Sequence, residues 1–171
     1  MDTTPDKSLW FFFKKGDLNA FKALFKIHYP ALHTYGIKLS NDSNLTEDCL
    51  QNFFIYLYEN RENLSDVNNI KSYLFVSFKR RLIKELKNKK SRTSFLEQAP
   101  LEQEIVFSPQ ELAVKQEVQF LCTKTLHNLL NDLPKREREV IYFKYYCDMT
   151  TLEISEVMEI KPQSALNILQ K

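Results

Sequence analysis

The sequence predicts an all-α protein made of two small helical domains joined by an acidic linker. Only 2 of the 171 residues are glycine, and tight turns and strand bulges usually need glycine. Apolar residues recur at spacings of three and four along most of the chain, which is the period of a helix with one buried face. Residues 91–111 lack this period and contain Pro100, Pro109 and several glutamates, so this stretch predicts the linker.

The first predicted domain, residues 8–90, begins with two apolar helices. The run Leu9–Phe13 is too short to cross a bilayer or to serve as a signal core, and we expect it to pack as part of a helix. Gly16 and Asp17 begin the next helix, in which Asp17 is the expected N-cap. An apolar stripe at helical spacing then continues to Leu39.

A further helix is predicted to run through Glu47 to about Asn60. Asn44 and Glu47 have the spacing of a capping box, with Asn in place of the usual Ser or Thr. One side of this helix is apolar and is expected to be buried, whereas the other side is largely polar. Taken by itself, the polar side fits an ordinary solvated surface. Its members are Asp48, Gln51, Asn52 and Ile55.

A basic helix is predicted from residue 71 to about 89, after a polar loop at residues 61–70. Residues 71–92 hold 9 Lys and Arg against one Glu, whereas the whole chain has a net charge of only +2. Such a local excess indicates an anionic partner at one place. Phe78 is expected in the core, while Tyr73 fits a core position and a base-stacking position equally well.

The second predicted domain, residues 112–171, contains four helices. Ser108 and Pro109 are the expected start of the first, which runs to about Asn131. The second is expected over residues 135–146 and the third to about Met158, where Thr150 and Glu153 have capping-box spacing. Pro162 is expected to open the last helix.

The last two helices form a candidate helix-turn-helix. A turn of about three residues makes two short helices cross steeply, which presents the second helix to the major groove of DNA. Gln and Asn can make paired hydrogen bonds to adenine. An ordinary helical hairpin would have the same local pattern. The outward side chains of the last helix are predicted to be Gln163, Ser164, Asn167 and Gln170.

Other classes of function have little support in the sequence. Cys49, Cys122 and Cys147 are far apart and form no Cys/His pattern, so we expect neither a metal site nor disulfides, and a reducing cytoplasm fits. The three histidines are scattered, and the sequence contains no glycine-rich phosphate loop and no nucleophile motif. We therefore expect no enzyme activity, no cofactor and no membrane insertion.

Five stretches resemble extracytoplasmic-function sigma factors, the smallest class of the sigma-70 family. The opening helix looks like the family's "GD…AF", and residues 46–54 are similar to "AEDxxQxxF". Residues 70–75, followed by basic residues, look like the promoter-melting helix. Residues 133–140 resemble "LPxxxRxV", and residues 153–156 match "EIAE" in the helix-turn-helix. The stretches occur in the family's order over residues 15–171.

The resemblance implies a role for each surface. The face that contains Asp48, Gln51, Asn52 and Ile55 would bind a coiled coil of the largest polymerase subunit. The loop and the basic helix would capture the minus-ten element and hold its nontemplate strand unpaired. The last domain would read the minus-thirty-five element. The implied minus-ten residues are Asn63, Asn68, Asn69, Lys71, Tyr73, Lys79, Arg80 and Lys84, and the implied minus-thirty-five residues are Thr151, Gln163, Ser164, Asn167, Gln170 and Lys171.

The sequence also departs from the family's pattern. The family often has Asn at the position of Arg80, and Ala and Gly where Ser155 and Glu159 stand. Glu159 would then adopt a turn conformation that glycine accepts more easily. The sequence stops at Lys171, where the family usually continues with basic residues, so we expect either a trimmed chain or weak minus-thirty-five binding.

The resemblance implies three partners: core RNA polymerase, promoter DNA and an anti-sigma factor, the last from the family alone. We expect the unbound protein to be a monomer. Two alternatives to a working sigma factor stay open. One is a sigma-like protein that binds polymerase or an anti-sigma factor without reading promoters. The other is a helix-turn-helix repressor, which would bind duplex DNA tightly without polymerase.

Overall fold

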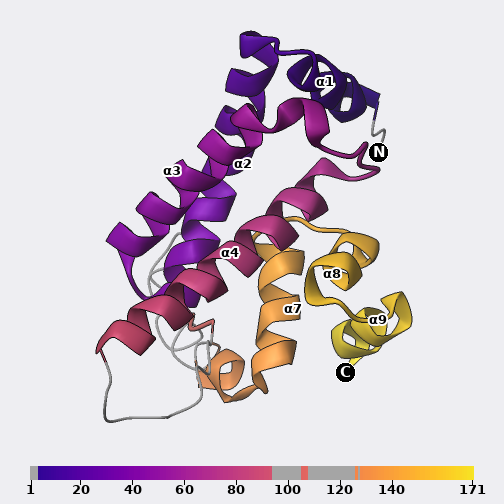
Figure 1. Cartoon of the computed structure of the whole chain (residues 1–171). Helices are drawn as coiled ribbons and strands as arrows, with labels where there is room; N and C mark the ends of the chain where they lie inside the picture. Colours follow the sequence, from indigo (N-terminus) through magenta and orange to yellow (C-terminus); the bar gives the residue numbers. More distant parts are fainter. Residues whose placement is uncertain (1–3, 94–104, 108–125, 127) are drawn as a thin grey trace, which may run out of the picture. The chain divides into compact units, whose positions relative to one another are not determined.

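Every regular element in the described part of the chain is a helix (Figure 1). The computed structural model describes residues 4–93, 105–107, 126 and 128–171. The prediction of an all-α protein is confirmed. The chain divides into two compact units, the first with the helices α1 to α4 and the second with α7, most of α8 and α9. Within the described ranges, no helix is long and apolar enough to cross a membrane.

The first unit is a bundle of three long helices closed at one end by a shorter one. Helices α2 (Leu18–Ser40), α3 (Ser43–Glu59) and α4 (Ile70–Thr93) lie side by side, and α1 (Thr4–Lys14) packs against α2 and α4 (Figure 1). A short 3-10 helix, η1 (Arg61–Asn63), follows α3. Burial of large apolar side chains between these helices drives the packing. Fully buried members of this core include Leu32, Tyr35, Leu50, Phe53, Phe75, Phe78 and Leu82.

At Gly36, α2 lies close to both α3 and α4. A Cβ atom at this position would lie 2.5 Å from Cγ2 of Thr46 on α3 and 3.0 Å from Cζ of Phe78 on α4. Both distances are shorter than an ordinary van der Waals contact. The missing side chain of Gly36 therefore sets how closely the three helices pack.

The starts of α2 and α3 are fixed by aspartates. The side chain of Asp17 accepts hydrogen bonds from the backbone N–H of Asn19 at 2.7 Å and of Ala20 at 3.4 Å, which confirms the predicted N-cap. The predicted Asn44–Glu47 capping box is wrong. The N-cap of α3 is Asp42, two residues before Asn44, because the carboxylate of Asp42 accepts from the backbone N–H of Leu45 at 3.0 Å.

The second unit is built around α7 (Lys135–Tyr145), which packs against α9 (Pro162–Gln170). Helix α8 (Thr151–Met158) lies between them in the sequence. The predicted capping box at its start is confirmed. The carboxylate of Glu153 accepts from the backbone N–H of Thr150 at 2.6 Å, and the Thr150 hydroxyl accepts from the N–H of Glu153 at 3.3 Å.

Part of the predicted linker packs onto the second unit. The backbone of Phe107 exchanges two hydrogen bonds with the side-chain amide of Asn131, at 3.1 and 3.2 Å. Its ring is fully buried and lies 5.4 Å from the ring of Tyr146. In the first unit, α4 continues to Thr93, three residues into the predicted linker. The expected helix start at residues 108 and 109, and Cys122, lie outside the described residues.

Candidate nucleic-acid interface

The predicted polar face of α3 points to solvent. Asp48, Gln51, Asn52 and Ile55 are all exposed, while the apolar positions between them are buried in the bundle. Ile55 is 46% exposed, which places one apolar side chain among three polar ones. Such a mixture suits a protein partner, because the centres of protein interfaces combine apolar and polar contacts.

Tyr56 extends this surface and was missed by the sequence analysis. Its ring is 42% exposed, and the guanidinium carbon of Arg81 on α4 lies 4.0 Å from the ring centroid. Tyr and Arg are enriched among interface residues that contribute most to binding. This pair could not be predicted from spacing, since the two residues are on different helices and only the packing of α3 on α4 brings them together.

The polar loop between α3 and α4 is anchored at both ends. Leu64 and Ile70 are buried, and the loop residues between them are exposed or half-buried. Near the start, Nη1 of Arg61 donates to the carbonyl oxygen of Tyr58 at 2.8 Å. Asn63 and Asn68, two predicted base-contacting residues, are exposed. The fold therefore presents these two amides on a loop whose ends are fixed.

Asn69 has a structural contact in addition to its predicted role. Its side-chain oxygen accepts a hydrogen bond from the backbone N–H of Ser72 at 2.9 Å, and it directly precedes the first residue of α4. This is the geometry of an N-cap. The side chain of Asn69 thus helps to begin the basic helix.

The basic side chains of α4 differ in their surroundings. Arg80 and Lys84 are exposed, and Lys71 and Lys79 are half-buried. Another lysine of α4 contacts the start of α3, since Nζ of Lys89 lies 2.5 Å from the carboxylate of the α3 N-cap Asp42. The hydrogen bond from Leu45, followed by the contact with Lys89, lowers the pKa of Asp42 below its usual value. Lys71, Lys79, Arg80 and Lys84, the four basic residues predicted to contact the minus-ten element, all lie on α4.

The aromatic residues of α4 belong mainly to the core. Phe78 is fully buried, as predicted. Tyr73, which the sequence left open, is half-buried, and its ring lies edge-on against Trp10 of α1 with 5.4 Å between centroids. Burial raises the pKa of the Tyr73 phenol, so it stays neutral at physiological pH. Tyr73 therefore joins α4 to α1 while keeping part of its ring accessible.

Helix α9 presents the four predicted polar side chains outward. Gln163, Ser164, Asn167 and Gln170 are exposed, whereas Ala165 is fully buried. Nε2 of Gln163 donates to Oδ1 of Asn167 at 2.8 Å, so the two amides are held next to each other. Paired amides on one helix face are suited to the edges of bases in a major groove.

The turn before α9 has the expected left-handed residue. Glu159 has a φ of 54°, which glycine adopts more easily than glutamate. Two other predicted contact residues of this unit are partly engaged. Thr151, the first residue of α8, is half-buried, and Nζ of Lys171 lies 3.0 Å from the carboxylate of Glu137 on α7. The Lys171 contact is one that sequence spacing could not have predicted.

Among the described residues, no group of His, Cys, Asp or Glu could hold a metal ion. Cys49 and Cys147 are buried thiols without a disulfide. Burial raises the pKa of Cys49 to about 11, which keeps this thiol protonated and poorly reactive at neutral pH.

Comparison with family models finds two matching segments. Residues 24–92 match sigma-70 region 2, and residues 123–170 match sigma-70 region 4. The two segments together make up more than half of the chain. The first contains the α3 face, the loop and α4, and the second contains α7, α8 and α9. A comparison with curated protein sequences finds no match.

Similar solved structures have the same fold. One is CnrH in complex with the cytosolic domain of CnrY, with a TM-score of 0.63, 15% identity and coverage of 96% of this chain and 90% of that chain. Another is the sigma factor RpoE in complex with the anti-sigma factor NepR from Bartonella quintana. Its TM-score is 0.61, with 15% identity and coverage of 90% of this chain and 91% of that chain.

The family matches and the fold agree with the surfaces described above. A basic helix behind a polar loop lies in the segment that matches region 2, and a helix with outward amides lies in the segment that matches region 4. The chain therefore belongs to the sigma-70 family and is a sigma factor, a protein that directs RNA polymerase to promoters.

Proposed function

We propose that the protein is a sigma factor of the extracytoplasmic-function type that uses three separate surfaces to start transcription. The face with Asp48, Gln51, Asn52 and Ile55 binds core RNA polymerase. The loop and α4 capture and hold the minus-ten element, and α9 reads the minus-thirty-five element. The observation that carries this proposal is the exposed polar loop, anchored at both ends, directly before a helix with a large excess of basic residues.

The minus-ten surface has the two components that single-strand capture requires. Asn63 and Asn68 offer exposed amides that can pair with the edge of an extruded base. Arg80 and Lys84 offer exposed positive charge, with Lys71 and Lys79 nearby on the same helix, and these attract the phosphates of the unpaired strand. Tyr73 adds a half-buried ring between the loop and the basic residues.

The minus-thirty-five surface depends on amides instead of charge. Gln163 and Asn167 lie one helical turn apart and can contact adjacent base edges. Residues 118–171 hold equal numbers of acidic and basic side chains, so electrostatic attraction to duplex DNA is weak. This observation favours a second candidate function, a sigma-like protein that binds polymerase but reads promoters poorly.

The proposed domain boundaries are residues 8–90 for the polymerase and minus-ten domain, 91–111 for the linker and 112–171 for the minus-thirty-five domain. The polymerase carries out all phosphoryl transfer, so the protein itself needs no catalytic residue and no cofactor. We further propose that it acts in the cytoplasm, where the polymerase is, and that an anti-sigma factor regulates it. Of the two similar solved structures, one is CnrH with the cytosolic domain of CnrY, and the other is the sigma factor RpoE with the anti-sigma factor NepR.

A run-off transcription assay tests the proposal. The full chain is added to core RNA polymerase from the same source, with genomic fragments as templates, and transcripts are compared with those made by core enzyme alone. Specific transcripts that depend on the protein are expected. Binding to core enzyme without transcripts would favour the interaction-only function, and tight duplex binding without polymerase would favour a repressor.

A further inference from the structure

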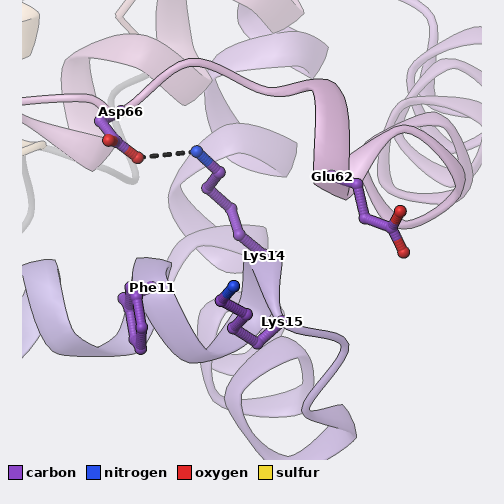
Figure 2. Close-up of a pocket in the computed structure, with 5 residues that line it drawn as sticks. All are labelled: Phe11, Lys14, Lys15, Glu62 and Asp66. Carbon is purple, nitrogen blue, oxygen red and sulfur yellow. Dashed lines mark hydrogen bonds and ion pairs between the residues drawn. The ribbon is translucent and has the colours of Figure 1, made fainter.

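Helix α1 contacts the middle of the loop that the proposed function assigns to base capture. Nε1 of Trp10 donates a hydrogen bond to the backbone carbonyl oxygen of Ser65 at 3.2 Å. One helical turn later, Nζ of Lys14 lies 2.7 Å from the carboxylate of Asp66 (Figure 2). Both residues of α1 precede residue 24, where the match to sigma-70 region 2 begins.

The middle of the loop has few other anchors. Leu64 and Ile70 hold its ends by burial, and Asn69 caps α4. Between them, Ser65, Asp66 and Asn68 are exposed, and Val67 is half-buried. A polar stretch of this kind has little apolar surface to hold it in one conformation, so hydrogen bonds and ion pairs to a neighbouring helix decide how well it is ordered.

Helix α1 is itself firmly seated and can act as a support. Trp10 is 3% exposed and Phe13 is 1% exposed, and the ring of Trp10 packs against Phe13 and against Tyr73 of α4. The other two aromatic residues of the Leu9–Phe13 run are different, since Phe11 and Phe12 are more than half exposed. The run therefore packs on one side only, and that side places Trp10 beside the loop.

Two surface hollows lie between α1 and the loop. A hollow of about 560 Å³ is lined by Phe11, Lys14, Lys15, Glu62 and Asp66, and Figure 2 shows Lys14 reaching Asp66 at its border. A smaller hollow of about 270 Å³ lies beside Trp10 and Asn68. Because the ion pair of Lys14 and Asp66 lies at this open surface, it can be removed without creating a cavity in the core, whereas a change at the buried Trp10 also affects packing.

We infer that Trp10 and Lys14 are positioning residues that hold the loop ready for base capture. With residues 65 and 66 tied to α1, Asn63 and Asn68 meet an unpaired base from a backbone that is already ordered. A preordered loop loses less conformational entropy on binding, which raises both affinity and discrimination between bases. This inference rests on the proposed function of the loop.

Four variants of the full chain separate the two contacts. Trp10→Phe keeps an aromatic ring and removes the donor, and Lys14→Met keeps the length of the side chain and removes the charge. Lys14→Asp combined with Asp66→Lys reverses the ion pair and should restore it. Lys15→Met is the matched control, because it removes the same charge at the residue that directly follows α1. Lys15 lies over the ring of Phe11, with Nζ 5.9 Å from the ring centroid, instead of contacting the loop carboxylate.

The first measurement needs neither polymerase nor DNA. Backbone ¹⁵N order parameters of residues 65–68 should fall in Trp10→Phe and Lys14→Met, from about 0.8 toward 0.6. They should stay unchanged in Lys15→Met and recover in the reversed pair. Unchanged loop order in both single variants would overturn the inference, whatever the protein does in transcription.

The second measurement tests whether order in the loop affects how well the holoenzyme distinguishes bases of the minus-ten element. Holoenzyme is tested on the promoter mapped by run-off transcription, and opening is compared between the natural minus-ten element and single-base substitutions. Trp10→Phe should reduce this discrimination about fivefold and Lys14→Met about twofold to threefold, with polymerase affinity unchanged. The reversed pair should recover discrimination.

The two measurements distinguish failure of the inference from failure of the proposed function. A loop that becomes mobile while discrimination stays normal would overturn the positioning role. A wild-type holoenzyme that opens no promoter would overturn the proposed function and the reading role with it, and the order parameters would still decide whether α1 holds the loop.

Discussion

Helices α4 and α9 are both candidates for contact with DNA, but their exposed residues suit different parts of it. The 24 residues of α4 are rich in Lys and Arg, and the stretch 71–92 has a charge of +8 by formal count from 9 basic residues and one Glu. The 9 residues of α9 include no charged side chain and present amides and a hydroxyl to solvent. The first composition suits phosphates, and the second suits base edges.

This difference indicates a division of labour between the two units. Phosphate contacts supply affinity that depends on salt and carry no sequence information, whereas hydrogen bonds to base edges carry sequence information and depend little on salt. In the proposed function, the loop before α4 adds base contacts to a charged surface. By contrast, α9 has no charged side chain, so we expect it to depend on the first unit and on polymerase to be brought to DNA.

The largest expected effect comes from reversing charge on α4. Lys79→Glu combined with Lys84→Glu should reduce promoter opening about a hundredfold, because both positions would repel the unpaired strand. Binding to core polymerase should change less than twofold, since neither residue lies on the α3 face. Open complexes can be measured by permanganate reactivity of unpaired thymines.

A matched control is Lys22→Glu combined with Lys26→Glu, which makes the same change of charge at exposed positions of α2. An equal loss of opening in both double variants would indicate a general effect of net charge and would remove α4 from the minus-ten surface.

Gly36→Ala tests whether the surfaces of the first unit depend on close packing of the bundle. A methyl group would meet Thr46 and Phe78, and we expect the free energy of unfolding to fall by about 1 to 3 kcal/mol, even though alanine favours a helix more than glycine does. Chemical denaturation measures this. Equal or higher stability would show that α3 and α4 can move apart without loss.

Gln51→Ala tests the polymerase face. Removing the exposed amide should weaken binding to core polymerase about fivefold, by loss of about 1 kcal/mol, and leave thermal stability unchanged. Asn44→Ala is the control, since Asn44 is an exposed polar residue near the start of α3, whereas Gln51 lies in its middle. If Gln51→Ala binds core enzyme as tightly as wild type, the amide has no role there.

Thr150→Ala tests the local support for the second unit. Loss of one half of the capping box should lower the free energy of unfolding of that unit by about 1 kcal/mol. Glu153→Ala should cost a similar amount, and the double variant should cost less than both together because the two residues form one unit. Fully additive effects would mean that the two side chains act independently.

The sequence predicted features that depend on local spacing. The N-cap at Asp17, the capping box of Thr150 and Glu153, and the burial of Phe78 follow from residues a few positions apart, and each is confirmed. The predicted N-cap of α3 was wrong for a local reason. Asp42 and Asn44 both suit an N-cap, and the bond from Leu45 to Asp42 decides between them.

Contacts between distant residues could not be predicted in this way. The bond from Trp10 to Ser65 joins positions 55 apart, and the pair of Lys14 and Asp66 joins positions 52 apart. The close packing at Gly36 could not be predicted, because a glycine inside a helix does not indicate which residues lie next to it. Periodicity shows which face of a helix is buried, but only packing shows which residues meet across helices.

The most direct test of the division of labour is the salt dependence of promoter binding. Holoenzymes with wild-type protein, Lys79→Glu/Lys84→Glu or Asn167→Ala are titrated onto the mapped promoter at several salt concentrations. The charge variant should lower the slope of log affinity against log salt by about 1.5 to 2. Asn167→Ala should leave the slope unchanged and weaken affinity about threefold or more at every salt concentration. An unchanged slope in the charge variant, or an equal change in both, would contradict the account.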